Sequence, residues 1–369
     1  MIPSNQKTFT KARVSGLFIF FILFCFHLIY SEEILLSKKL LTIISTKKDE
    51  VPFFKSAPSM IFHEDFLYIV ENAYSKILQF RYDNNNLVFE KSIGQRGQGP
   101  GDLFLPMRIK RDGSNIVVSD NNKISFFSED GKFIRNFNHF SIGVEFLVHD
   151  NKVFFLSPKP QTNSFIKVYS LIGEFIGYVG EKFLNPICSA KNCYLQEFIV
   201  YKGILLDDEN YIYYFNELFG NLQKIDNSGK IILTRDISDV LGKFIIKRKE
   251  QNEDLFIKGD FNFNKNGQLR IPHYPLFQSA CLRGDSIYFL TPPLCPQEYD
   301  KKNFIEIRSI NKKNFALENV YKLYLENVKD SIKLFDVKEV KQNGKTIFIV
   351  LLDTEADGFS LYELYEGGN

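Results

Sequence analysis

The sequence has no tryptophan and almost no net charge, at +2 over 369 residues. It contains no long run of Lys or Arg, so it lacks the basic footprint of a nucleic-acid-binding domain. No G-x-S-x-G motif of a hydrolase occurs. The histidines are scattered, and His63-Glu64 lacks the second histidine of a zinc-binding helix. Nucleic acid is therefore not an expected partner, and no familiar catalytic set is present.

Phenylalanine and tyrosine are abundant instead, with 38 and 18 residues, and apolar residues make up 44% of the chain. That fraction is sufficient for a sizeable core. Aromatic and β-branched side chains suit the pleated, half-buried surface of a sheet. The composition therefore favours an all-β protein, while the length fits either one large domain or two ordinary ones.

The first thirty residues differ from the rest. Lys7, Lys11 and Arg13 precede an almost wholly apolar run, residues 14–30. A basic stretch before an apolar run is typical of a secretory signal, and the run approaches the length of a membrane span. We predict that residues 1–31 are a signal peptide or an N-terminal membrane anchor. Residues 32–369 would then be exported: periplasmic, secreted, or held on the outer side of the membrane through residues 14–30.

Four cysteines follow the leader. Cys188 and Cys193 are close in sequence, as are Cys281 and Cys295. An even number of cysteines in an oxidising compartment permits two disulfides. The sequence favours these two local pairs, because each closes a short loop between strand-like segments. Four free thiols are the alternative, and a zinc site is disfavoured because neither pair has CxxC spacing.

A short pattern recurs six times: a strand-forming run of four residues, followed four residues later by Gly or Asn. The Gly or Asn suits a hairpin turn with positive φ, and another strand-like segment precedes each copy. Most intervals between copies fit four-stranded blades of about 40–50 residues. We therefore predict a six-bladed β-propeller of four-stranded antiparallel blades. The copies begin at Ile77, Ile124, Ile166, Leu222, Phe304 and Leu361.

The longest interval between copies contains residues 236–275, which we interpret as an insertion with a helical first part. A degenerate seventh blade there is the alternative. The strand-like segment 34–45 comes before the first full unit. We predict that it completes the last blade, because closing the ring removes exposed sheet edges.

The stretch 94–102, GQRGQGPGD, is rich in glycine. It lacks the Lys and the hydroxyl of a phosphate-binding loop. It resembles the blade linker of a bacterial six-bladed β-propeller family related to NHL-repeat proteins. Residues 71–77 and 120–124 resemble turns of the same family, so the resemblance is specific over residues 61–137. It implies a propeller fold, and the family includes many exported proteins of unassigned role.

Polar side chains follow the second strand of several units. In a propeller these turns open on the same face as the loops between blades, around the central channel. A ring of carboxylate and amide oxygens can bind a hard cation such as Ca²⁺, although Asp and Asn also cap ordinary turns. The channel-face candidates are Glu71, Arg96, Asp102, Asp120, Asn216 and Asp353.

These features support two hypotheses about function. The first is a non-enzymatic binding or interaction scaffold for a protein, a peptide or a glycan. The second is a metal-dependent hydrolase or lyase of the propeller lactonase kind, with its site at the central channel. The sequence favours the first hypothesis, because no assembled catalytic set accompanies the repeats.

Overall fold

The computed structural model describes residues 32–45, 54–83, 86–139, 145–157, 163–183, 200–258, 262–263, 269–270, 275–292, 304–325, 331–340, 345–354 and 358–366. The leader, residues 1–31, lies outside these ranges, so its role in export stays a prediction. Within the described ranges, no helix is long and apolar enough to cross a membrane.

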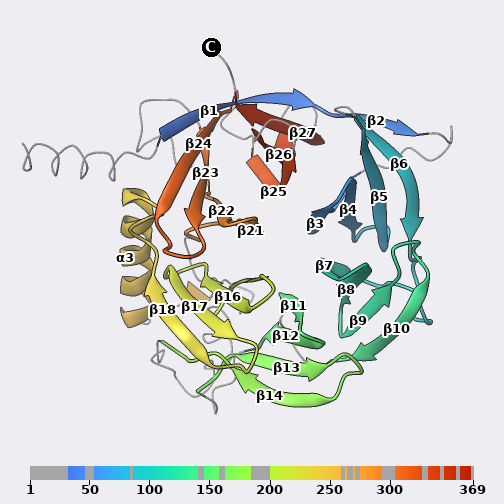
Figure 1. The fold of residues 1–369 in the computed structure, drawn as a ribbon, viewed down its shortest axis with the longest axis horizontal. Coiled ribbons are helices and arrows are strands. Elements are labelled where there is room, and N and C mark those ends of the chain that lie inside the picture. The colour runs from blue at the N-terminus through green and yellow to red at the C-terminus, as the bar shows by residue number, and fades with distance from the viewer. Residues whose placement is uncertain are drawn as a thin grey trace, which may run out of the picture.

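The described chain forms repeated antiparallel sheets that stand around a central axis (Figure 1). The first strand of each unit is nearest the axis, and the fourth is outermost. The second strands are short apolar runs between turns and are almost wholly buried, as expected for strands covered on both faces. The first four units, from inner to outer strand, are β3 (Ser59–His63), β4 (Phe66–Glu71), β5 (Lys76–Asp83) and β6 (Asn86–Ile93); β7 (Pro106–Asp112), β8 (Asn115–Asp120), β9 (Lys123–Phe127) and β10 (Phe133–Asn138); β11 (Phe146–His149), β12 (Lys152–Leu156), β13 (Ile166–Ser170) and β14 (Phe175–Val179); and β15 (Gly203–Asp207), β16 (Tyr211–Asn216), β17 (Asn221–Asp226) and β18 (Ile231–Asp236).

Two further units share one eight-stranded sheet, which the N-terminal strand joins together. The fifth unit is β21 (Ser279–Arg283), β22 (Ser286–Leu290), β23 (Phe304–Asn311) and β24 (Leu317–Tyr324), and the sixth contains β25 (Ser331–Val340), β26 (Lys345–Thr354) and β27 (Gly358–Glu366). The joining strand is β1 (Glu32–Leu40). Its first residues pair in parallel with β24, and residues 36–40 pair antiparallel with β27.

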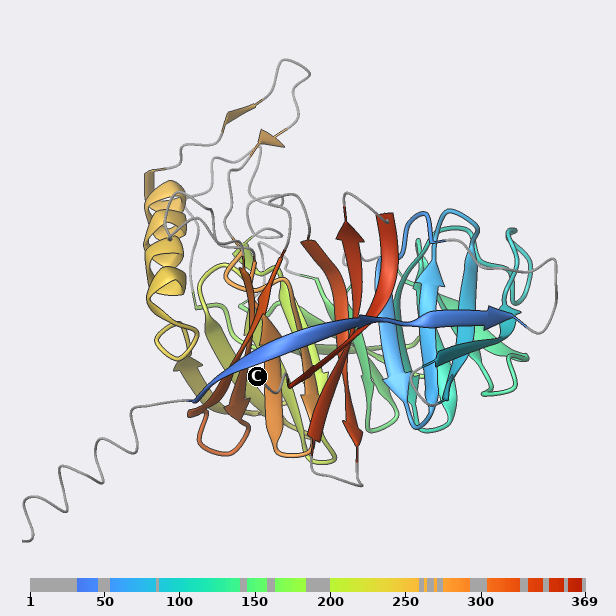
Figure 2. The same ribbon diagram turned by 90° about the horizontal axis from the view of Figure 1, so that it is seen from above.

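The N-terminal segment continues beyond this junction as β2 (Thr42–Ser45), which pairs in parallel with β6. The segment therefore lies along the outer edges of three neighbouring units, as Figure 2 shows. Pairing with β27 confirms the prediction that residues 34–45 complete the last unit. The additional pairing with β24 and β6 goes beyond that prediction.

The hairpin between the third and fourth strands explains the recurring glycine. Gly173 and Gly229 both have a φ of 89°, a region that glycine adopts without the strain of a Cβ. Gly173 also packs against the preceding unit, where a Cβ would come within 2.7 Å of the Phe137 side chain. In the fifth unit the positive φ lies at Phe315, and Asn311 caps the longer turn through its side chain.

The predicted insertion, residues 236–275, begins with turns after β18 and continues as helix α3 (Lys243–Lys258). The helical first part of the insertion is thereby confirmed. The helix lies against the outside of the fourth and fifth units (Figures 1 and 2). Ile245 anchors it in a buried cluster, and Asn252 Nδ2 donates to the Leu218 carbonyl at 2.9 Å. A small hairpin follows, of β19 (Asn262–Phe263) and β20 (Leu269–Arg270).

Buried clusters lie between successive units rather than at one centre. Tyr68 and Val70 of the first unit, for example, pack with Ile109 and Ile116 of the second. Each sheet thus covers its neighbours, and the ring leaves its inner strands facing the axis. Antiparallel sheets stacked radially in this way define a β-propeller.

Candidate functional site

The inner strands line a cavity of about 410 Å³ along the central axis. Residues of β3, β7, β11, β15, β21 and β25 all contribute to its wall. We call the end where the inner strands begin the linker face, because the loops between units lie there. The opposite end, where inner strands turn into second strands, is the hairpin face. The volume falls within the range of small-ligand sites.

A group of charged side chains lies at the linker face of this cavity. Glu145, just before β11, contacts Arg108 Nε at 3.3 Å and Lys110 Nζ at 3.0 Å. Arg108 also donates to the Pro58 carbonyl at 2.5 Å, so β7 is tied to the units on both sides. We call this group the charged mouth, and its members are Arg108, Lys110, Glu145, Lys202 and Glu217.

Glu217, directly after β16, is the more buried carboxylate of the mouth, at 7% exposure. Its Oε2 lies 2.8 Å from Lys202 Nζ. Burial raises the pKa of Glu217, the Lys202 charge opposes that shift, and the Glu145 charge adds to it. The side chains of Arg108 and Lys202 are 34% and 47% exposed, whereas those of Glu145 and Glu217 are 12% and 9% exposed. The charges that the mouth presents to solvent are therefore mainly those of its cations.

The hairpin face holds the units together through side chains from the ends of inner strands. Arg283 Nη2 contacts Asp336 at 2.9 Å and donates to the Phe62 carbonyl at 3.0 Å. Asp336 Oδ2 in turn accepts from the Phe62 backbone nitrogen at 2.7 Å. One arginine therefore joins the fifth, sixth and first units.

Cys281 lies beside this ion pair in β21, and it is a free, buried thiol. Burial raises the pKa of the Cys281 thiol well above its ordinary value, and the Asp336 charge adds to the rise. The Cys281 thiol lies close to Asp336 on the cavity wall. Because Cys295 lies outside the described residues, the Cys281–Cys295 disulfide that the sequence favours stays a prediction. Cys188, Cys193 and Cys295 lie outside the described residues.

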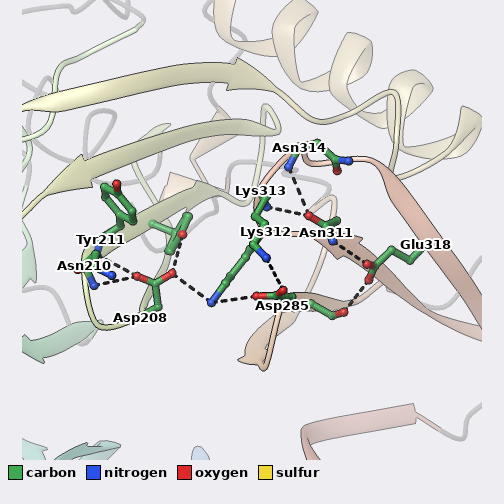
Figure 3. Close-up of polar contacts among 11 residues, drawn as sticks. Asp208, Asn210, Tyr211, Asp285, Asn311, Lys312, Lys313, Asn314 and Glu318 are labelled. Atoms are coloured by element: carbon green, nitrogen blue, oxygen red, sulfur yellow. Dashed lines mark hydrogen bonds and ion pairs between the residues drawn. The ribbon is translucent and has the colours of Figure 1, made fainter. Parts of the chain in front are cut away.

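A polar network fastens the fourth unit to the fifth on the same face (Figure 3). Lys312 Nζ lies 3.4 Å from Asp208 and 3.5 Å from Asp285. Asp208 also accepts from Tyr213 Oη at 2.9 Å, and Lys313 Nζ contacts Asp285 at 2.6 Å. Each carboxylate in the network has partners, so the network is a structural junction between units.

Two of the predicted channel-face carboxylates hold loops. Glu71, at the end of β4, is fully buried. Asp120, at the end of β8, accepts from the Phe104 and Leu105 nitrogens at 3.0 and 2.5 Å and lies 3.5 Å from Lys123 Nζ. The carboxylate of Glu71 accepts, at 2.9 to 3.1 Å, from the backbone nitrogens of Lys55, Ser56 and Ala73.

Asn216 has the same role in the fourth unit. Its Nδ2 donates to the Val200 carbonyl at 2.6 Å, and its Oδ1 accepts from the Leu218 and Phe219 nitrogens at 3.0 and 2.7 Å. The polar residue that ends the second strand thus uses its hydrogen-bonding groups on the adjoining loops. This is the turn-capping alternative that the sequence left open.

The other predicted residues lie apart from this pattern. Asp102 braces the glycine-rich linker, accepting from Gln95 Nε2 and the Gly99 nitrogen at 2.9 Å each, and these bonds lower the pKa of Asp102. Arg96 is exposed in the same linker. Asp353 belongs to β26, and its side chain lies outside the described part. Binding of a ligand by these residues stays a prediction.

A calcium site does not fit the oxygens found at these positions. Glu71, Asp120 and Asn216 belong to three different units, and backbone N–H groups occupy their oxygens, whereas Ca²⁺ needs six to eight convergent oxygen ligands. Among the described ranges, no group of three or more His, Cys, Asp or Glu side chains is placed to hold a metal ion.

The charged mouth includes residues that the sequence analysis did not single out. Arg108 and Lys110 of β7 lie close to Glu145, just before β11, because these two inner strands are neighbours at the axis. A signal was present in β7, PMRIKRD, where charged residues occupy a strand that is covered by neighbours on both sides. Such charges need partners or solvent, and a channel wall provides both.

The fold and this cavity place the protein in the class of β-propellers with a charged channel. No family model matches the sequence, and no curated protein matches it. The solved structures that are similar include two from Bacteroides species. A Bacteroides fragilis NCTC 9343 protein, named as a candidate exported protein, has a TM-score of 0.51 and 13% identity, covering 91% of this chain and 100% of that one.

The second similar structure is a member of the DUF4221 family from Bacteroides vulgatus ATCC 8482. It has a TM-score of 0.50 and 14% identity, covering 91% of this chain and 96% of that one. At such identities the likeness concerns the fold alone. The predicted β-propeller is thus confirmed, while membership of the NHL-related family stays a prediction.

Proposed function

We propose that this chain is an exported six-bladed β-propeller that binds a protein segment or peptide at the linker face, without chemical change to its ligand. The count of six blades is supported by the six units, with β1 as the added strand of the last one. Export is supported by the basic and apolar leader of residues 1–31.

The charged mouth is the observation that carries the proposal. Its carboxylates are already paired with Arg108, Lys110 and Lys202, which suits recognition by complementary charge rather than activation of water. The exposed parts of Arg108 and Lys202 suit the carboxylates and backbone carbonyl groups of a peptide. Complementary charges of this kind favour specific association.

An apolar patch on the linker face supports a protein ligand. Tyr74, Phe104 and Leu105 are 50%, 47% and 42% exposed. Ser75 Oγ donates to the Phe104 carbonyl at 2.9 Å, which joins the two loops that carry the patch. Phe104 and Leu105 lie within four residues of Arg108 in sequence. Exposed aromatic residues beside charged groups are typical of protein-binding surfaces.

The test is a selection of displayed random peptides on the full-length protein, followed by calorimetric titration of the selected peptides. Phe104→Ala removes a ring that is 47% exposed, so we expect binding about tenfold weaker or more. Ile172→Ala is the matched control, because Ile172 is 67% exposed but distant from the mouth. Equal effects of the two substitutions, or binding of glycans alone, would contradict the proposal.

The metal-dependent hydrolase hypothesis is tested on the same protein. We expect the melting temperature to be unchanged by EDTA and by added Ca²⁺, Mg²⁺ or Zn²⁺, because a ligand bound only by the folded state stabilises it by mass action. A drop with EDTA that one cation reverses would favour the hydrolase. Bound peptides should be recovered intact by mass spectrometry.

A further inference from the structure

The wall of the central cavity includes the backbone edges of inner strands. Within the described ranges, each inner strand is the end strand of its sheet, so its second edge faces the axis (Figure 1). Unbroken runs of residues, such as 108–111 and 278–283, line the cavity. Because side chains alternate between the two faces of a strand, an unbroken run indicates that the backbone itself belongs to the wall. An open edge presents N–H and C=O groups, with which a peptide main chain forms hydrogen bonds.

Side chains from neighbouring units already use some of these backbone groups. The Leu205 nitrogen of β15 donates to Glu145 Oε1 at 3.3 Å, and the Leu205 carbonyl accepts from Lys110 Nζ at 3.1 Å. The Phe62 nitrogen of β3 donates to Asp336 at 2.7 Å. Polar groups that reach the axis therefore do form hydrogen bonds with the wall.

The size of the cavity favours the end of a chain over an internal segment. Its volume of about 410 Å³ is in the range of sites for drug-sized ligands, which corresponds to a few residues of a peptide. An internal segment has to enter and leave through one opening, whereas a chain end only enters. A terminal residue is therefore the part of a peptide that suits this cavity.

The charges at the linker face select which end of a chain is attracted. The charged mouth has three cations, Arg108, Lys110 and Lys202, and two carboxylates, which are mostly buried. Lys333, the third residue of β25, adds a further cation to the cavity wall. An excess of positive charge attracts a C-terminal carboxylate and repels an N-terminal ammonium group.

Two of these cations have donors to spare. Arg108 uses Nε for Glu145 and Nη1 for the Pro58 carbonyl, and its Nη2 forms no hydrogen bond with a described residue. Lys202 Nζ has three donors, and its contact within the described ranges is with Glu217 at 2.8 Å. The charges of Lys202 and Arg108 both act on Glu217, so the two cations lie around one place.

We propose that the linker end of the cavity binds the C-terminal carboxylate of a peptide or of an exposed protein C-terminus. The carboxylate accepts from Arg108 Nη2 and Lys202 Nζ, and the last main-chain amides bond to the open edges of the inner strands. The preceding residues lie towards the apolar patch of Tyr74 and Phe104. Capture of a C-terminal carboxylate is a recurring mode of peptide recognition. This inference rests on the peptide-binding function proposed above and names the part of the peptide that is recognised.

The experiment exposes the full-length protein to N-acetylated random octapeptides, made once as free acids and once as C-terminal amides. Retained peptides are identified by mass spectrometry and titrated by calorimetry. We expect free acids to be retained, and the amide of a retained sequence to bind about tenfold more weakly or worse, the loss that corresponds to hydrogen bonds with a charged group.

The other outcomes separate the two proposals. Equal binding of acids and amides contradicts the carboxylate site and leaves the peptide-binding function standing. Equal binding that is confined to peptides rich in Asp or Glu assigns the mouth to acidic side chains, and it also contradicts the carboxylate site. Retention of neither form contradicts both proposals.

Substitutions at the mouth test the residues involved. Lys202→Met should lower the affinity for the free acid about tenfold and leave the affinity for the amide unchanged, whereas damage to the fold would lower both. Glu217→Gln should strengthen binding of the free acid, because it removes the carboxylate that competes for Lys202. Lys313→Met is the matched control, since Lys313 is 70% exposed and pairs with Asp285 at 2.6 Å on the hairpin face. Equal effects of Lys202→Met and Lys313→Met would overturn the inference.

Discussion

At the scale of single residues, a repeat glycine satisfies two requirements that no other residue type satisfies together: a positive φ and a close contact with the neighbouring unit. Gly173 turns the hairpin with positive φ and lies against Phe137 of the neighbouring unit. Gly173→Ala should lower the free energy of unfolding by at least about 1–2 kcal/mol, the cost of a left-handed conformation for an L-residue. Denaturant titration measures this change.

Gly177 provides the matched control in the same hairpin. A Cβ there meets nothing within 4 Å, and its φ is not positive. Gly177→Ala should therefore change the free energy of unfolding by no more than about 0.5 kcal/mol. Equal losses of unfolding free energy for the two variants would show that neither the turn nor the contact with Phe137 requires glycine at position 173.

His149 makes one junction between units sensitive to pH. The hydrogen bond to Asp207 raises the pKa of His149, with burial opposing the shift. A base with a raised folded-state pKa stabilises the fold when protonated. That contribution is complete below the unfolded-state pKa of about 6.5 and is lost as the pH rises through the higher folded-state pKa.

We therefore expect the free energy of unfolding to fall as the pH rises above about 6.5, because His149 then loses its proton. The effect should stay below about 1 kcal/mol, because the Asp207 side chain is 37% exposed and solvent screens the pair. Urea unfolding at several pH values measures it, and Asp207→Asn should flatten the pH dependence. An unchanged slope in that variant would exclude His149 as its source.

At the scale of elements, strand β1 is the part on which closure of the ring depends. Leu36 is 8% exposed and packs in the cluster between the fifth and sixth units, whereas Leu40 of the same strand is 52% exposed. Leu36→Ala should cost about 2–3 kcal/mol of unfolding free energy. Leu40→Ala should stay within about 0.5 kcal/mol. Similar values for both would mean that β1 pairs with its neighbours without packing into the core.

The ends of the second strands show that a sequence pattern can locate a side chain without indicating which groups it contacts. The sequence placed Glu71, Asp120 and Asn216 on the linker face, as found. Their oxygens then accept from backbone N–H groups of nearby loops, because a loop at the rim of a sheet leaves such donors unpaired. A sequence pattern locates these side chains, but only the path of the loops decides which donors reach them.

At the scale of the whole molecule, stability depends on contacts between units that are distant in sequence. Phe62 bonds to Asp336 across 274 positions, and β1 pairs with strands near the other end of the chain. No unit buries both faces of its sheet without neighbours. The ring therefore has to close before most of this burial is complete.

The strands, the hairpin glycines, the helix of the insertion and the closing role of residues 34–45 were all determined by the sequence, because each depends on local periodicity or turn chemistry. The charged mouth, the burial of the Cys281 thiol and the contact of Arg111 with Tyr68 were decided by the tertiary structure. Arg108 and Lys110 form ion pairs with Glu145, whereas the guanidinium of Arg111 in the same strand lies over the Tyr68 ring. In the closed ring, the unit that lies beside an inner strand supplies the partner of a charged side chain on that strand. The local sequence does not identify this partner.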